Sequence, residues 1–127
     1  MLMKHFKLLI AILLALVPLF TWADAVEIDG IYYNLSAVGD TAVVTVNPNQ
    51  YSGDIVIPDE VNYGKTYKVY AIGEKAFQYN KDVTSVQIGA NVVEIKGNAF
   101  NNTGITNLVI PEGVTRIEHH AFMSNSK

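Results

Sequence analysis

The feature that most constrains the fold of this chain is a repeat of 22 to 23 residues in its C-terminal half. Each unit contains a valine, an isoleucine three residues later and an Ala-Phe pair four residues after that. The three pairs are Ala76-Phe77, Ala99-Phe100 and Ala121-Phe122. A unit this short cannot bury its own apolar side, whereas stacked units bury one another in a continuous core. The repeat therefore predicts a coil of stacked turns.

Each complete unit also predicts one short β-strand. The apolar residues Val83, Val86 and Ile88 of one unit align with Ile105, Leu108 and Ile110 of the next. Alternation directs Val86 and Ile88 to one side of the strand and Ser85 and Gln87 to the other. We expect each Ala-Phe pair to pack inward at a bend, where the small alanine leaves room for a neighbouring ring.

The residues before the repeat predict a β cap over the first turn of the coil. Residues 26–35 and 41–46 are rich in strand-forming side chains, and the turn residues 37–40 separate them, which indicates a hairpin. Residues 53–57 predict a third strand that ends at Pro58. A stacked coil needs such a cap at its end. The expected fold class is mainly β, a solenoid with an N-terminal β-hairpin or meander cap.

The first unit carries an insertion of eight residues relative to the others, because Ile57 to Val69 spans 12 positions where Ile88 to Val92 spans 4. Apolar and aromatic residues flank Gly64-Lys65 within residues 61–67, which predicts a small projecting β-hairpin. This hairpin either carries binding residues or extends the cap.

The N-terminus predicts export. Lys4 and Lys7 precede an apolar run over residues 8–20, and small residues follow it, so cleavage is expected after Ala23 or Ala25. The run is shorter than the roughly 20 residues of a membrane-spanning helix. We expect a signal peptide helix and no membrane span after its removal; an uncleaved membrane anchor is the alternative.

The expected organisation has three parts: a signal peptide at 1–23, the N-terminal β cap at 24–58, and repeats at 59–127 that are incomplete at the C-terminus. The last Ala-Phe pair is followed by only five residues, and no further strand or closing cap follows. We therefore expect the sequence to be the front of a longer protein, with a naturally short protein as the alternative.

Composition argues against several function classes. Nine Lys and Arg against 12 Asp and Glu give a net charge of −3, which weakens a case for nucleic acid binding. The chain has no Cys, which excludes disulfides, thiol catalysis and thiolate metal sites. It also lacks a phosphate-binding loop, and Ser124-Asn125-Ser126-Lys127 matches S-x-x-K without the strand and helix that such a nucleophile requires. We predict no enzyme, cofactor or metal.

Three further groups of polar residues have ordinary structural explanations. His119 and His120 are adjacent, and on an extended segment they would point to opposite sides and chelate one metal poorly. Their ordinary explanation is a bend with one solvated histidine. Asp24, Glu27 and Asp29 form an acidic cluster that we expect to be solvated. The seven tyrosines either form a recognition surface or pack on half-buried strands, and we favour packing.

The repeat resembles the BspA-type leucine-rich repeats. The resemblance lies in residues 83–88, 92–95 and 98–100, with 110–114 in the next unit, and the segments 29–33, 51–58 and 64–69 are similar to the N-terminal cap of those proteins. The family implies secreted or surface-exposed bacterial proteins, some of them adhesins that bind host extracellular-matrix proteins or other microbes. Family repeats often place Cys three residues after the Phe. Here Asn80, Thr103 and Asn125 occupy those places, and we expect them to bond turn backbone.

The expected function is a secreted or cell-surface leucine-rich-repeat binding module for adhesion or protein recognition. The outward strand residues are small, neutral and polar, and they form the candidate protein-binding site. They are Thr84, Ser85, Gln87, Thr106, Asn107 and Val109. The expected partner is a host extracellular-matrix protein or another cell-surface protein. A stable interface needs about 800 Å² per partner, so useful affinity is expected to need further repeats. The alternative is a structural stalk, or the N-terminal part of a larger secreted protein, even an enzyme, with no binding role of its own.

Overall fold

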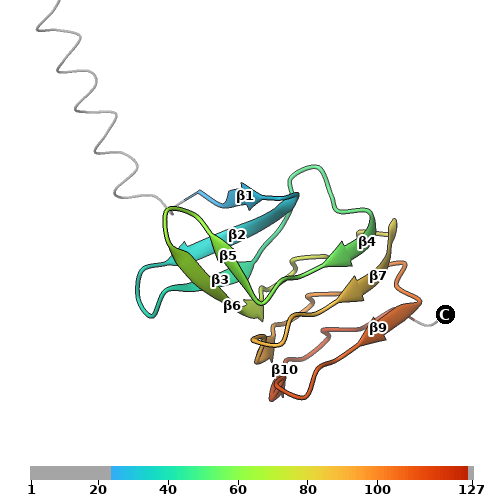
Figure 1. Ribbon diagram of the computed structural model, residues 1–127. Coiled ribbons are helices and arrows are strands. Elements are labelled where there is room, and N and C mark those ends of the chain that lie inside the picture. The colour runs from blue at the N-terminus through green and yellow to red at the C-terminus, as the bar shows by residue number, and fades with distance from the viewer. Residues whose placement is uncertain (1–23, 126–127) are drawn as a thin grey trace, which may run out of the picture.

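The computed structural model describes residues 24–125, and within this range the chain forms two β-sheets and no helix. The expected signal peptide at 1–23 lies outside the described residues. The larger sheet has the order β1-β2-β3-β6-β8-β10, with β5 paired to β6, and the smaller has the order β4-β7-β9 (Figure 1). The strands are β1 (Val26–Ile28), β2 (Ile31–Ser36), β3 (Thr41–Val44), β4 (Gly53–Val56), β5 (Glu60–Asn62), β6 (Thr66–Ile72), β7 (Val83–Gln87), β8 (Glu94–Ile95), β9 (Asn107–Val109) and β10 (Arg116–Ile117).

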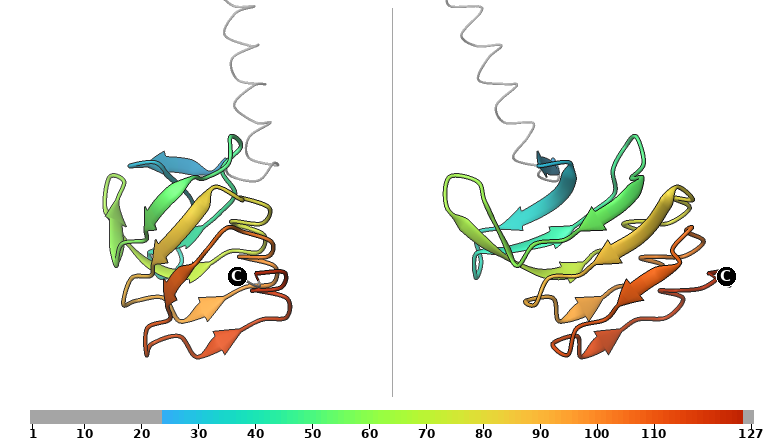
Figure 2. Two further views of the ribbon diagram at one scale, coloured as in Figure 1. Left: turned by 90° about the vertical axis from the view of Figure 1, so that its right-hand side faces the viewer. Right: turned by 45° about the vertical axis from the view of Figure 1, so that its right-hand side comes forward.

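Equivalent strands of successive units lie side by side, parallel and in register. Ser85 pairs with Asn107 and Gln87 pairs with Val109, each 22 positions further along the chain. The isoleucines Ile72, Ile95 and Ile117 pair in the same way in the larger sheet. Figure 2 shows β4, β7 and β9 following one another along one wall and β6, β8 and β10 along the other. The sequence alignment of the units is therefore confirmed as a spatial alignment.

The aromatic rings of the units form a continuous stack in the core. The ring centroids of Phe77 and Phe100 are 5.0 Å apart, and those of Phe100 and Phe122 are 5.3 Å apart, with nearly parallel planes. Tyr51 extends the stack, with its ring 4.5 Å from that of Phe77. The expected inward packing of the Ala-Phe pairs is confirmed. Each fully buried ring contributes about 1.5–3 kcal/mol relative to exposure.

The bend around each Ala-Phe pair has the same backbone conformation in every unit. The residue before the pair has a positive φ, 60° at Lys75, 57° at Asn98 and 63° at His120. The second residue after the phenylalanine is also left-handed in each unit. Successive bends are joined by backbone hydrogen bonds, such as that from Phe100 N–H to Ala121 O at 2.8 Å. The strained backbone conformation recurs because the bends must stack.

Polar residues stand where family repeats often have cysteine, and their side chains form hydrogen bonds with backbone groups of the bends, as predicted. Asn80 is buried, and its Oδ1 accepts a hydrogen bond from Tyr51 N–H while its Nδ2 donates to Gln78 O. One unit further on, Thr103 donates from both its backbone N–H and its Oγ1 to Asn125 Oδ1, each at 2.8 Å. These side chains satisfy backbone groups that the tight bend leaves without partners.

The N-terminal segment differs from the expected single hairpin. Asp29 and Gly30 have φ values of 51° and 88°, and they end β1 and begin β2 as an antiparallel pair. Two successive positive φ values are the mark of a type I′ turn, which Asp-Gly favours. Gly30 N–H also donates to Glu27 Oε2 at 2.8 Å. Residues 26–35 therefore form two strands, and the turn at 37–40 joins β2 to β3 as predicted.

The strand at 53–57 also differs from the expectation. β4 does not continue the meander; it pairs in parallel with β7 as the first strand of the smaller sheet. The physical reason is the alternation of Ile55 and Ile57, whose buried side chains match Val86 and Ile88 of the next unit. The link between cap and repeats is made instead in the larger sheet, where β3 pairs in parallel with β6.

The predicted hairpin around Gly64-Lys65 is confirmed as the antiparallel pair β5–β6. Its tip is tied to the β2–β3 turn, because Lys65 Nζ lies 2.7 Å from Asp40 Oδ1. The same ammonium group lies 5.6 Å from the ring centroid of Tyr67. These contacts favour the interpretation of the hairpin as an extension of the cap.

Candidate functional site

The outward side of the smaller sheet presents a set of side chains from three units. Ile55 and Val86 point inward and are buried, so their strand neighbours point outward. We call the outward set the strand face. It consists of Asp54 and Val56 of β4, Ser85 and Gln87 of β7, and Asn107 and Val109 of β9. We also include the exposed Thr84, which lies at the register shift of β7, and the exposed Thr106 immediately before β9.

The register of the sheet arranges the strand face in two rows. One row is Asp54, Ser85 and Asn107, which are directly opposed on adjacent strands. Ser85 Oγ donates to Asp54 Oδ1 at 2.6 Å, and Thr84 Oγ1 donates to the same oxygen at 3.3 Å. The hydroxyl groups therefore engage the only carboxylate in this row.

The second row is Val56, Gln87 and Val109. The two valines are 59% and 74% exposed, which is unusual for branched apolar side chains on strands. The row presents an amide between two apolar groups. It can give a partner both apolar contact and a pair of hydrogen bonds.

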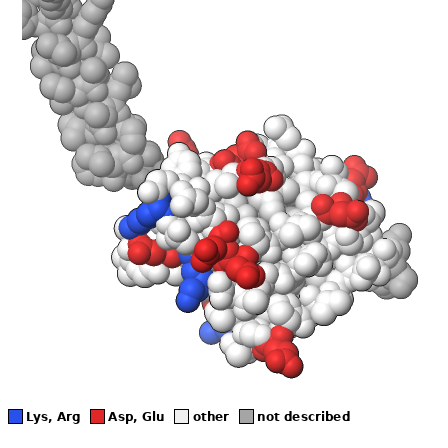
Figure 3. All heavy atoms as spheres, in the orientation of Figure 1, with Lys and Arg blue, Asp and Glu red and all other residues white. Residues whose placement is uncertain are grey.

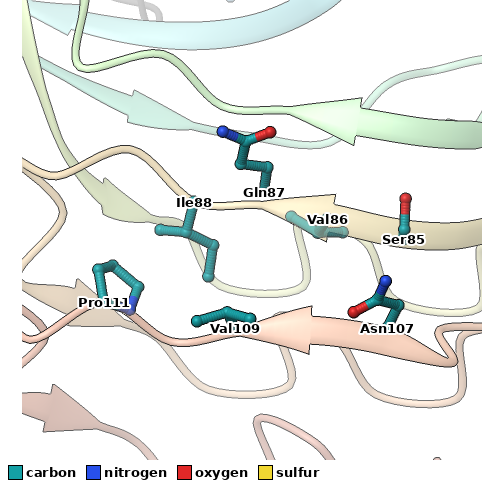
Figure 4. A pocket seen from close by; sticks show the side chains of 7 residues that line it. All are labelled: Ser85, Val86, Gln87, Ile88, Asn107, Val109 and Pro111. Atoms are coloured by element: carbon teal, nitrogen blue, oxygen red, sulfur yellow. The ribbon is translucent and has the colours of Figure 1, made fainter.

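A hollow of about 460 Å³ lies along β7 and β9 on this side of the sheet. Figure 4 shows the side chains around it, with Ser85 and Gln87 on β7 and Asn107 and Val109 on β9. Ile88 and Pro111, which follow the two strands, complete its apolar part. No charged side chain lines the hollow. Figure 3 shows that much of the surface over β7 and β9 in this view is likewise uncharged.

The structure brings four of the six predicted site residues to this hollow. They are Ser85, Gln87, Asn107 and Val109. Thr84 and Thr106 are also exposed, and Thr106 N–H donates to Thr84 O at 3.0 Å beside the hollow. A binding role for any of the six stays a prediction.

Sequence reasoning missed the contribution of β4 to the strand face. Asp54 and Val56 were expected in the cap, yet they lie opposite Ser85 and Gln87. The signal was present in the alternation Ile55-Val56-Ile57, which matches Val86-Gln87-Ile88. Ile57 aligns with Ile88 across the hairpin insertion, yet residues 53–57 were assigned to the cap because they follow its expected hairpin directly.

The two histidines lie in a bend, as their ordinary structural explanation requires. The segment is a turn and not an extended strand, because His120 has a φ of 63°. The ring centroids of His119 and His120 are 3.7 Å apart, so the rings stack on one side. The bend is therefore confirmed, and the opposite-side arrangement expected of an extended segment does not occur. Within residues 24–125 no group of three or more His, Asp and Glu side chains is arranged to hold a metal.

Two tyrosines belong to the core and not to a recognition surface. Tyr33 and Tyr51 are 1% and 3% exposed. Tyr51 Oη donates to Thr45 O at 2.6 Å and accepts from Tyr32 N–H at 3.0 Å. Burial raises the pKa of Tyr51 to about 12. The packing interpretation is confirmed for these two side chains.

Residues 55–127 match the family model described as BspA type leucine rich repeat region. The chain belongs to this family. The match begins within β4 and covers both walls of stacked strands. Among the residues that the structure describes, we found no helix of the length and apolarity needed to span a membrane.

Solved structures of bacterial leucine-rich repeat proteins have the same fold. A leucine rich cell surface protein from Faecalibacterium prausnitzii is 33% identical over 76% of this chain, with a TM-score of 0.63. A leucine-rich repeat protein from Bacteroides ovatus is 31% identical over 70%, with a TM-score of 0.60. The pneumococcal vaccine antigen PcpA is similar in fold alone, with 18% identity over 78% and a TM-score of 0.58. The chain spans only 27%, 24% and 30% of these three proteins. A search of the curated proteins found no match.

Proposed function

We propose that this protein is a secreted or cell-surface binding module whose strand face recognises another protein. The observation that carries the proposal is the uncharged hollow of about 460 Å³ on β7 and β9, flanked by outward valines. An exposed apolar group beside neutral amides suits a polypeptide, which offers both apolar side chains and backbone hydrogen-bonding groups.

The likeness to a protein described as a leucine rich cell surface protein supports the location. In this proposal residues 1–23 direct export, residues 24–58 supply the cap together with β4, the first strand of the smaller sheet, and residues 59–127 form leucine-rich repeats of a solenoid. The partner is a host extracellular-matrix protein or another cell-surface protein. Because the strands of successive units pair in parallel and in register, each unit adds one residue to each row of the strand face. Further repeats would therefore enlarge the binding area.

The residues of the strand face support recognition over catalysis. Its one carboxylate, Asp54, accepts hydrogen bonds from the hydroxyl groups of Thr84 and Ser85. No histidine or second carboxylate lines the adjoining hollow to act as a base. A structural stalk is the second candidate, because the three short strands β4, β7 and β9 expose little area.

Surface plasmon resonance against a panel of purified extracellular-matrix proteins tests the proposal. The variant Gln87→Ala/Asn107→Ala/Val109→Ser should weaken binding at least about tenfold, because it truncates the centre of the contact. The matched control is Val93→Ser/Thr115→Ala, two exposed residues beside the strands of the larger sheet. Equal binding by the strand-face variant and the wild type would contradict the proposal. Absence of binding to every panel member would favour the stalk.

A further inference from the structure

A second hollow lies where the cap meets the first repeat. It has a volume of about 330 Å³ and is formed by the β1–β2 turn, the end of β4 and strand β5. Its walls include the apolar side chains Ile28, Ile31, Val56 and Val61. Ligand pockets in proteins begin at about 300 Å³, so this hollow fits one group the size of a side chain.

Two carboxylates line this hollow. Asp29 and Glu60 are both exposed, and neither carboxylate forms a hydrogen bond or ion pair with another residue of the described range 24–125. Asp29 is fixed by the type I′ turn. Glu60 lies opposite Lys68 across the β5–β6 pair, yet no ion pair joins them. The lining thus has negative charge without a partner.

The buried side chain of Tyr33 also lines this hollow. Tyr33 is only 1% exposed and lines the hollow, and its Oη has no hydrogen-bond partner among residues 24–125. Burial raises the pKa of Tyr33, and electrostatic interactions with Tyr51 and Asp29 raise it further. The Tyr33 hydroxyl is therefore held more firmly in its protonated form than a free phenol.

We propose that this hollow binds an organic cation on an apolar stem, the chemistry shared by a lysine side chain and a free alkylamine. The apolar walls contact the stem, the carboxylates of Asp29 and Glu60 neutralise the ammonium group, and Tyr33 Oη accepts one of its N–H bonds. The site goes beyond the proposed function and adjoins the strand face through Val56, which belongs to both.

An NMR titration of the isotope-labelled protein tests this site with three probes. They are N-acetyl-lysine amide, n-butylammonium, and N-acetyl-norleucine amide, which has an apolar stem and no charge. Shifts should centre on the amides of Ile31, Tyr33 and Val61 with the first two probes and be absent with the third. Tighter binding of the lysine probe than of butylammonium would assign the site to a polypeptide partner. Equal binding would assign it to free amines.

Variants that remove one charge each test whether the two carboxylates bind the cationic probes. Asp29→Asn keeps a residue that tolerates positive φ, and Glu60→Gln keeps the side-chain shape. Each should weaken binding of the cationic probes by about fivefold, and Tyr33→Phe should weaken it by about threefold. The control Glu112→Gln removes an exposed carboxylate outside the hollow and should change nothing. Equal binding of the norleucine probe, or unchanged binding by both acidic variants, would overturn the proposal. The strand-face variant leaves Asp29, Glu60 and Tyr33 intact. A failure of cation binding in this hollow can therefore be distinguished from a failure of protein recognition by the strand face.

Discussion

Gly104 shows at the scale of one residue how closely the units approach one another. A Cβ atom at this position would lie 2.1 Å from Lys81 O and 3.1 Å from Val83 O, both of them backbone atoms of the preceding unit. At Gly97, in contrast, the nearest atom to such a Cβ would be His119 O at 3.6 Å, an ordinary contact. The first glycine is required by packing between units, and the second is not.

We therefore expect Gly104→Ala to lower the free energy of unfolding by about 1–3 kcal/mol, because the backbone of two units must move apart. Gly97→Ala is the matched control and should change stability by less than about 1 kcal/mol. Urea denaturation followed by circular dichroism measures both. Equal stability of the two variants would contradict the close contact at Gly104.

The raised pKa of Tyr51 predicts that the protein loses stability at alkaline pH. Its pKa is raised from 10.0 to about 12 in the folded protein because burial disfavours the phenolate. The folded state thus holds its proton more tightly than the unfolded state. The resulting stabilisation is complete below pH 10 and is lost as the pH rises from 10 to 12, by about 1.4 kcal/mol per pH unit.

Urea titrations between pH 8 and 11.5 measure this slope. Tyr51→Phe should reduce it, since the variant has no proton to lose at this position, although the raised pKa of Tyr33 leaves part of it in place. Tyr63→Phe is the control, because Tyr63 is 54% exposed. An unchanged slope in Tyr51→Phe would show that its burial does not govern its titration.

At the scale of the element, the bends depend on buried side-chain amides. Asn80 accepts the backbone N–H of Tyr51, which is 29 positions earlier, and so joins the cap to the first repeat bend. Asn80→Leu should lower the free energy of unfolding by about 1–3 kcal/mol, since it leaves that buried N–H without a partner. The control Asn107→Leu changes an exposed amide and should have little effect on chemical denaturation. Similar losses in both variants would argue against the bend contact.

The elements of the repeat could be predicted from sequence because their apolar spacing is regular. The strand at 83–87, the inward Phe residues and the polar residues at 80, 103 and 125 all follow from that register. The β1–β2 turn was missed although Asp29-Gly30 is a strong turn signal, because the surrounding residues form an unbroken β-rich run. β4 was assigned to the cap because residues 53–57 follow the expected cap hairpin directly, although Ile57 aligns with Ile88 across the hairpin insertion.

The candidate site was only partly predictable for a related reason. Alternation indicates which residues of one strand point outward, and this placed Ser85, Gln87, Asn107 and Val109 correctly on the exposed side. Alternation does not reveal which strand of the cap region lies next to the first repeat. The hollow between cap and repeat depends on Tyr33 and Glu60, residues 27 positions apart that only the folded chain brings together.

At the scale of the whole molecule, both walls depend on parallel pairing of units 22 to 23 residues apart. The stacked rings, the repeated left-handed bends and the two rows of the strand face all require this register. A shift of one residue would turn Ser85 and Gln87 inward and remove the strand face altogether.

The most direct test is a nuclear Overhauser experiment on the uniformly labelled protein. The account predicts backbone contacts of the parallel type between Val86 and Leu108 and between Ile72 and Ile95, residues that are far apart in the sequence. It also predicts contacts between the rings of Phe77 and Phe100. An antiparallel pattern between these strands, or the absence of any contact between residues one repeat apart, would contradict it.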